Sequence, residues 1–189
     1  MKKTVAILFF VIVKCQVLFS QKDNLVVFFT DAITNSVPVY ADDTTIVSYT
    51  SVKEDTEKEN WHDVEIIEQS NNRYKVCITA INEENIAPIT GWVDKEQCGV
   101  WFWGRWAKPE NCIVSLYHMP GLLCSFIKIT GKYPDCFDNY STTNNKAFPV
   151  LDYKLYKGEY WIKTVIVKDE KKIVGWTKDY CPNVYGSCN

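Results

Sequence analysis

The most informative segment of this chain reads Val64-Glu-Ile-Ile-Glu-Gln-Ser-Asn-Asn-Arg-Tyr74-Lys-Val76, and it is followed by Gly91-Trp92-Val93. A second segment matches it, Val150-Leu-Asp-Tyr-Lys-Leu-Tyr-Lys-Gly-Glu-Tyr160-Trp-Ile162, followed by Gly175-Trp176-Thr177. The interval from valine to tyrosine is ten residues in both copies, and the interval from tyrosine to Gly-Trp is 17 and then 15 residues. This order and spacing indicate an internal repeat.

The repeat also extends toward the N-terminus of each copy. Tyr40 is followed nine residues later by Tyr49, and Tyr117 is followed nine residues later by Phe126. We therefore expect two consecutive domains, residues 21–106 and residues 107–189, after an N-terminal segment of 20 residues.

Both copies consist of short apolar or alternating runs separated by turn-forming residues. In the first copy these runs cover residues 25–30, 64–68, 73–80 and 89–93, and they are rich in Val, Ile and aromatic residues. No window of eleven or more residues has a helical apolar period. The sequence therefore predicts an all-β chain. Short strands with one buried face must remove their exposed edges, which predicts closure into two tandem small barrels.

The repeated segment resembles the bacterial SH3-like domain. The order of a turn, Tyr74-Lys-Val76 and then Gly91-Trp-Val93 is similar to that family's signature on its third to fifth strands, and the second copy repeats it. The resemblance implies two SH3-like barrels that cover nearly all of residues 21–189. The usual N-terminal strand of the family is absent from the first copy. The second copy has a longer loop, since Tyr117 to Val150 spans 33 residues against 24 for Tyr40 to Val64.

The composition is that of a globular, mildly acidic protein. The chain has 189 residues, of which 47% are hydrophobic and 23% charged, so it can bury a core. Its formal charge is −2 and becomes −5 without Lys2, Lys3 and Lys14. An acidic chain lacks the basic surface of a nucleic-acid-binding protein, so we expect no nucleic acid among its partners.

The N-terminus has the features of a secretory signal. Lys2 and Lys3 precede an apolar run over residues 5–13, which is too short for a helix that spans a bilayer, since that needs about 20 residues. A small residue, Ser20, marks the expected cleavage site. We therefore expect an exported protein, periplasmic or extracellular, that does not span the membrane. The alternative is a lipoprotein anchored through Cys15, although Lys14 does not suit a lipoprotein signal.

The cysteine content supports export. Seven cysteines follow Cys15, which is common in an oxidising compartment. Disulfides between cysteines that are close in the sequence would be Cys98–Cys112, Cys124–Cys136 and Cys181–Cys188, which would leave Cys77 free. The disulfide connectivity stays open, because sequence does not choose among the possible pairings. The second pair would stiffen the longer loop of the second copy. No Cys-x-x-Cys pair or Cys/His cluster occurs, so we expect neither a metal nor another cofactor.

Catalytic chemistry has little support in the sequence. Neither His62 nor His118 lies beside a serine or cysteine in a known catalytic motif, and both are interpreted as ordinary surface or loop residues. The carboxylate pairs lie in polar, turn-like stretches, where solvation explains them better than glycoside hydrolysis does. Two barrels also leave no room for a separate catalytic domain. We therefore do not expect an enzyme.

Aromatic residues are the most suggestive candidates for binding. Trp101 and Trp103 point to one face of an aromatic strand, which forms either an interface between the barrels or a ligand platform. The resemblance to SH3-like barrels, which bind peptides in aromatic grooves, implies four further groove residues. They are Tyr40 and Trp61 in the first copy, and Tyr117 with Tyr153 (or Tyr156) in the second. Trp92 and Trp176, in the Gly-Trp pairs, are interpreted as structural.

The resemblance and the aromatic residues favour a non-catalytic binding module of the bacterial envelope. Its ligand would be a cell-wall peptide or glycan, such as part of peptidoglycan, or an envelope protein. The alternative is a periplasmic inhibitor or immunity-type protein that blocks an enzyme with the disulfide-stiffened loop over residues 132–145. Fold by itself does not decide between the two.

Overall fold

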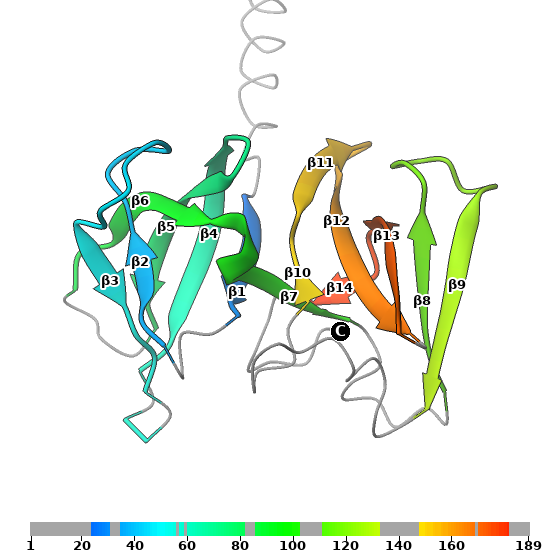
Figure 1. Ribbon diagram of the computed structural model, residues 1–189, viewed down its shortest axis with the longest axis horizontal. Helices are drawn as coiled ribbons and strands as arrows, with labels where there is room; N and C mark the ends of the chain where they lie inside the picture. Colours follow the sequence, from blue (N-terminus) through cyan, green and yellow to red (C-terminus); the bar gives the residue numbers. More distant parts are fainter. Residues whose placement is uncertain are drawn as a thin grey trace, which may run out of the picture.

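The computed structural model describes residues 24–30, 35–55, 57–58, 60–81, 86–102, 111–132, 148–168 and 170–181. Within these ranges the chain forms fourteen β-strands and one short 3-10 turn, η1 (Lys95–Gln97) (Figure 1). The all-β class predicted from the sequence is therefore confirmed. The described ranges contain no helix that is long and apolar enough to cross a membrane.

The strands form three antiparallel sheets. The first has the order β10-β7-β1-β4-β5-β6, with β14 also paired to β7. Its strands are β1 (Leu25–Phe29), β4 (His62–Gln69), β5 (Arg73–Ala80), β6 (Ile89–Asp94), β7 (Cys98–Phe102), β10 (Phe148–Pro149) and β14 (Tyr180–Cys181). The second has the order β11-β12-β13-β8-β9. Its strands are β8 (Asn111–Tyr117), β9 (Phe126–Lys132), β11 (Asp152–Tyr156), β12 (Glu159–Lys168) and β13 (Lys171–Thr177). The third is the hairpin of β2 (Val37–Val39) and β3 (Thr50–Val52).

None of these sheets closes on itself within the described residues. The two closed barrels predicted from the sequence are therefore not confirmed. Where closure would be expected, single residue pairs connect the strands: Tyr40 bridges to Trp92 in the first half, and Tyr117 pairs with Trp176 in the second.

These two pairs lie at equivalent positions of the repeat. In each copy a tyrosine, directly after β2 or at the end of β8, pairs with the tryptophan of the Gly-Trp motif in β6 or β13. In the first copy the bridge consists of two main-chain hydrogen bonds, of 2.8 and 2.9 Å, between Tyr40 and Trp92. The internal repeat is therefore present in the structure as well as in the sequence.

The glycine of each Gly-Trp motif has a steric function at this point. A Cβ on Gly175 would lie 2.7 Å from the Cβ of Leu116 and 3.2 Å from the carbonyl oxygen of Tyr117. A Cβ on Gly91 would meet the side chain of Val39 and lie 3.0 Å from the carbonyl oxygen of Tyr40. Only glycine lets the two strands approach this closely.

The larger of the two buried clusters joins the two halves of the chain. The larger cluster of buried side chains combines strands β1 to β7 with Val150 and Ile162 of the second half. The hydroxyl of Tyr74, which is fully buried, donates a 2.9 Å hydrogen bond to the carbonyl oxygen of Val150. Strand β7 also pairs with both β10 and β14, so strand pairing crosses the expected boundary between residues 106 and 107.

Two of the predicted disulfides are wrong, because Cys98 and Cys124 are free thiols. Cys98 lies in the first sheet opposite Phe29 and is completely buried, whereas Cys112 belongs to the second sheet. Burial raises the pKa of the Cys98 thiol, which keeps it protonated and unreactive. Cys124 is exposed between β8 and β9. Cys77 is a half-buried free thiol, and Cys136 and Cys188 lie outside the described residues.

The close approach at Gly175 predicts that Gly175→Ala destabilises the protein by about 1–3 kcal/mol, because β8 must shift to admit the methyl group. Gly158→Asn is the control. Gly158 lies in open space but has a φ of 83°, so asparagine there meets no crowding and carries only the backbone strain of a positive φ, which it tolerates better than most residues. Urea unfolding of both variants would measure the difference. Equal stability of Gly175→Ala and the wild-type protein would contradict the packing described here.

The Tyr74 hydrogen bond predicts a second stability effect. Tyr74→Phe removes the donor and leaves the buried carbonyl of Val150 without it, which should lower the free energy of unfolding by about 1–2 kcal/mol. Tyr49→Phe, at a tyrosine that is 54% exposed, is the control and should cost less. The comparison uses urea unfolding at neutral pH, and a similar cost for the two variants would argue against the buried contact.

Buried tyrosines also predict alkaline sensitivity. Burial raises the pKa of both Tyr74 and Tyr180 above the ordinary value of 10.0. The unfolded chain therefore loses these protons first, so stability is retained below about pH 10 and falls as the pH rises further. Unfolding titrations at pH 9 to 12 should show this fall, and it should be shallower in Tyr74→Phe. An identical pH dependence in that variant would refute the contribution of Tyr74.

Candidate functional site

Tyr40, one of the residues predicted to line a groove in the first copy, is covered by another side chain. Its ring is 9% exposed, because the guanidinium carbon of Arg73 lies 3.5 Å above the ring centroid. Arg73 is held there by a 2.8 Å ion pair with Asp94 and by hydrogen bonds to the carbonyl oxygens of Asp42 and Thr45. Tyr40 therefore packs beneath a fixed cation.

Trp61 and Tyr153, the other residues predicted for the two grooves, lie just before β4 and in β11. Trp61 is half-buried just before β4, and its carbonyl oxygen accepts a hydrogen bond from the amide of Ile81. The ring of Tyr153 lies in the contact between the halves, 5.8 Å from the ring of Tyr74. Burial is the main cause that raises the pKa of Tyr153, and the nearby Tyr160 raises it further.

The aromatic strand is described only in part. The main chain of Trp101 pairs with Cys181, which places β7 beside a strand of the second half. This backbone position is consistent with the interface interpretation of the strand. The side chain of Trp101 and all of Trp103 lie outside the described residues, as does the predicted inhibitory loop after Lys132.

Tyr117 belongs to a cluster of rings on one face of the second sheet. Because side chains alternate along a strand and paired residues share a face, the register places five aromatic residues on the face opposite the buried Ile162 and Leu116. We call this surface the aromatic face; it comprises Tyr117, Phe126, Tyr156, Trp161 and Trp176.

The rings of the aromatic face are packed against one another. The ring centroid of Tyr117 lies 5.4 Å from that of Phe126 and 5.3 Å from that of Trp161, the latter in an edge-to-face arrangement. Trp161 is 2% exposed, and Trp176 is 7% exposed beneath the Lys154 ammonium, 5.3 Å from its ring. The tryptophans therefore form the floor of the face. Phe126, 47% exposed, and Tyr156, 39% exposed, are the accessible rings.

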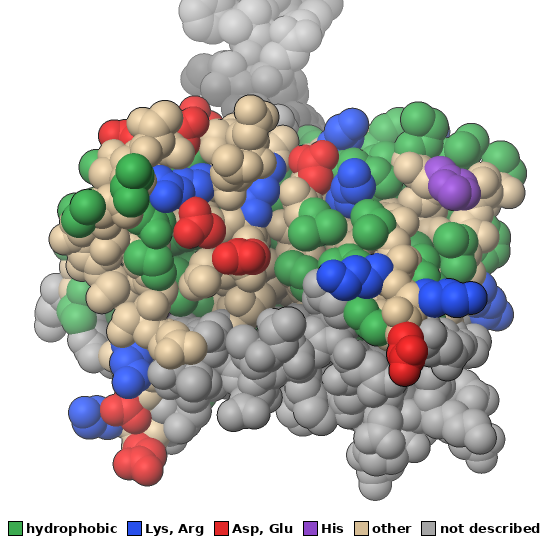
Figure 2. Space-filling model, in the orientation of Figure 1, with side chains coloured by type: hydrophobic (Ala, Val, Ile, Leu, Met, Phe, Trp, Pro, Cys, Tyr) green, Lys and Arg blue, Asp and Glu red, His purple; other side chains and the backbone are tan. Residues whose placement is uncertain are grey.

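The turn between β8 and β9 borders the aromatic face. Gly121 has a φ of 78°, and a Cβ at this position would collide with the ring of Tyr156, so the turn lies directly against that ring. Three large apolar side chains of the turn, Met119, Leu122 and Leu123, are exposed. Figure 2 shows apolar side chains gathered over this end of the second half. Contiguous apolar surface of this kind marks sites of interaction.

One polar atom in the floor of the face is unsatisfied. The indole nitrogen of Trp161 is buried and has no hydrogen-bond partner among the described residues. The residues predicted from the sequence include Tyr117 and, as an alternative, Tyr156, but not Phe126, Trp161 or Lys154, which belong to the same surface. The spacing of Phe126 from Tyr117, which repeats that of Tyr49 from Tyr40, was the available signal for Phe126.

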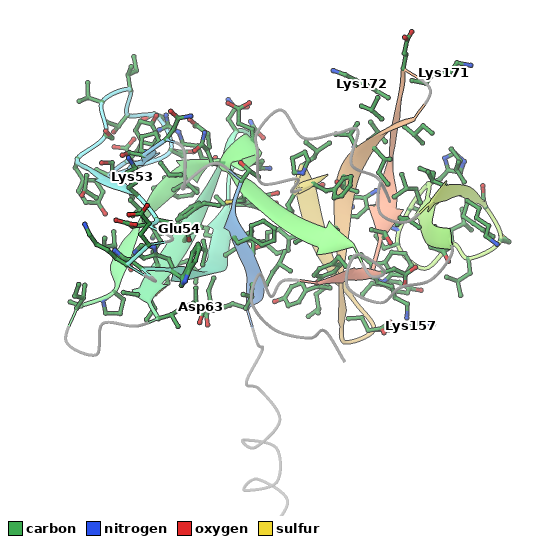
Figure 3. The ribbon with its side chains drawn as sticks, turned by 90° about the horizontal axis from the view of Figure 1, so that it is seen from below. Lys53, Glu54, Asp63, Lys157, Lys171 and Lys172 are labelled. Carbon is green, nitrogen blue, oxygen red and sulfur yellow. The ribbon has the colours of Figure 1, made fainter. Side chains whose placement is uncertain are left out.

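The two histidines differ from each other. His118 is exposed in the turn after β8, as expected. The side chain of His62 is 11% exposed, and its Nδ1 lies 3.8 Å from Oε1 of the buried Glu54, so the surface interpretation of His62 is wrong. Glu54, labelled in Figure 3, also accepts a hydrogen bond from the His62 amide, which joins the segment after β3 to β4. The described residues contain no group of three or more metal-ligating side chains.

Comparisons with known proteins found no matching family model, no matching curated protein and no matching solved structure. The functional argument therefore depends on the chain's own residues and on the geometry of the aromatic face.

Proposed function

We propose that this chain is a non-catalytic, exported binding module of the bacterial envelope, which holds a cell-wall glycan or peptide against the aromatic face. The observation that carries the proposal is the combination of Phe126 and Tyr156, two accessible rings, with the packed floor of Tyr117, Trp161 and Trp176. Exposed aromatic anchors on a rigid base are typical of binding surfaces.

The aromatic face is suited to binding because its rings are held in place before a ligand arrives. Tyr117 and Phe126 are directly opposite each other on the paired strands β8 and β9, and Tyr117 also pairs with Trp176 of β13. Rings fixed in this way lose little conformational entropy on binding. A flat set of rings is complementary to the apolar faces of sugar rings and to the side chains of an extended peptide.

The repeat supports assigning the two halves to tandem SH3-like modules. Each copy has a Gly-Trp strand that is crossed closely by the end of an upstream strand, at Gly91 and at Gly175. In SH3-like domains aromatic residues form the ligand groove. In this chain the equivalent position of the first copy, Tyr40, is covered by Arg73, so the proposal assigns binding to the second copy.

Pelleting with insoluble peptidoglycan tests the proposal. The purified protein should sediment with the peptidoglycan, and Phe126→Ala combined with Tyr156→Ala should weaken binding about tenfold or more, because truncating central aromatic anchors removes most of the binding energy.

The control is Ile46→Ala, which removes a side chain that is 90% exposed on the turn between β2 and β3 of the first copy. It should pellet like the wild-type protein. Wild-type binding that the double variant retains would remove the aromatic face from the proposal. Failure of the wild-type protein to pellet would overturn recognition of the cell wall.

A further inference from the structure

The two halves of this chain differ strongly in charge. Residues 21–106 contain seven basic and fifteen acidic residues, a formal charge of −8. Residues 107–189 contain eleven lysines and eight acidic residues, a formal charge of +3. On the face shown in Figure 2, the carboxylates lie mostly over the first half. Asymmetry of this kind within an acidic protein indicates that the basic half meets an anionic partner.

Part of this positive charge is on the aromatic face itself. Lys163 is directly opposite Trp176 in the pairing of β12 with β13, so the two side chains share a face. Lys154 is opposite Trp161, and its ammonium lies over the ring of Trp176. Lys128, two residues after Phe126, is exposed on the same face. These lysines form no ion pair with a carboxylate of the described residues.

Carboxylates on this face are fewer and are already engaged. The two carboxylate oxygens of Glu159 accept hydrogen bonds of 2.9 and 3.0 Å from the ammonium of Lys178. Asp152 is opposite Lys163 and accepts a hydrogen bond from the amide of Tyr153. The face therefore keeps an excess of positive charge next to its accessible rings.

We infer that the ligand of the aromatic face is peptidoglycan with free carboxylates, which are held by Lys154 and Lys163 while its apolar portions contact Phe126. The inference rests on the proposed function and names the chemical class of its ligand. The carboxylates carry the specificity, because a neutral glycan would gain the ring contacts and leave the two ammonium groups without an anion.

The test compares two preparations of the same peptidoglycan, one native and one with its carboxylates converted to amides by carbodiimide and ammonia. The wild-type protein should bind the amidated material about tenfold more weakly and should lose affinity for the native material as salt rises. Lys154→Gln combined with Lys163→Gln should weaken binding to the native material by a similar factor, and the corresponding arginine variants should restore it.

The control is the charge-matched pair Lys53→Gln and Lys171→Gln. Lys53 lies in the first half. Lys171 lies on the side of β13 that points away from the aromatic face, opposite to Lys172 (Figure 3). This variant should bind like the wild-type protein, and thermal unfolding verifies that both double variants are folded. Equal binding of the two peptidoglycan preparations, still dependent on Phe126, would overturn the inference but leave the proposed function intact. Absence of binding to both preparations would overturn both.

Discussion

The structure depends on the close contact between two strands in each half, which is possible only because one of them carries a glycine. At Gly175 the end of β8 comes so near that a single methyl group would lie 2.7 Å from the Cβ of Leu116. The following residue, Trp176, then pairs with Tyr117. The same contact occurs at Gly91 with the end of β2. Each contact fixes a tyrosine beside a tryptophan, and this arrangement determines where an aromatic surface can form.

The two copies use this arrangement differently because different side chains surround the tyrosine. In the first copy Arg73 lies over Tyr40 and is itself fixed by Asp94, so the ring serves as packing surface. In the second copy Tyr117 instead contacts Phe126 and the buried Trp161, and the surface remains accessible. The repeat therefore conserves the backbone contact, while the side chains above it divide the copies into a structural half and a candidate binding half.

The halves are also not independent of each other. Strand β7 pairs with β1 of the first half and with β10 and β14 of the second, and Tyr74 bonds to Val150 within the shared core. These contacts join the acidic first half to the basic second half. In the second half the lysines of the sheet lie beside its rings. This combination of apolar rings and ammonium groups that form no ion pair within the described residues is what the proposed ligand chemistry depends on.

The sequence by itself determined the all-β class, the repeat and the structural importance of the Gly-Trp pairs, because these follow from local alternation and spacing. It did not determine closure of the sheets, the free thiols of Cys98 and Cys124, or the burial of Tyr40 and Tyr153. Those outcomes depend on contacts between residues far apart in the chain, such as Arg73 with Tyr40 and Tyr74 with Val150. Whether an aromatic residue becomes core or binding surface is decided by what covers it, and only the tertiary structure supplies that cover.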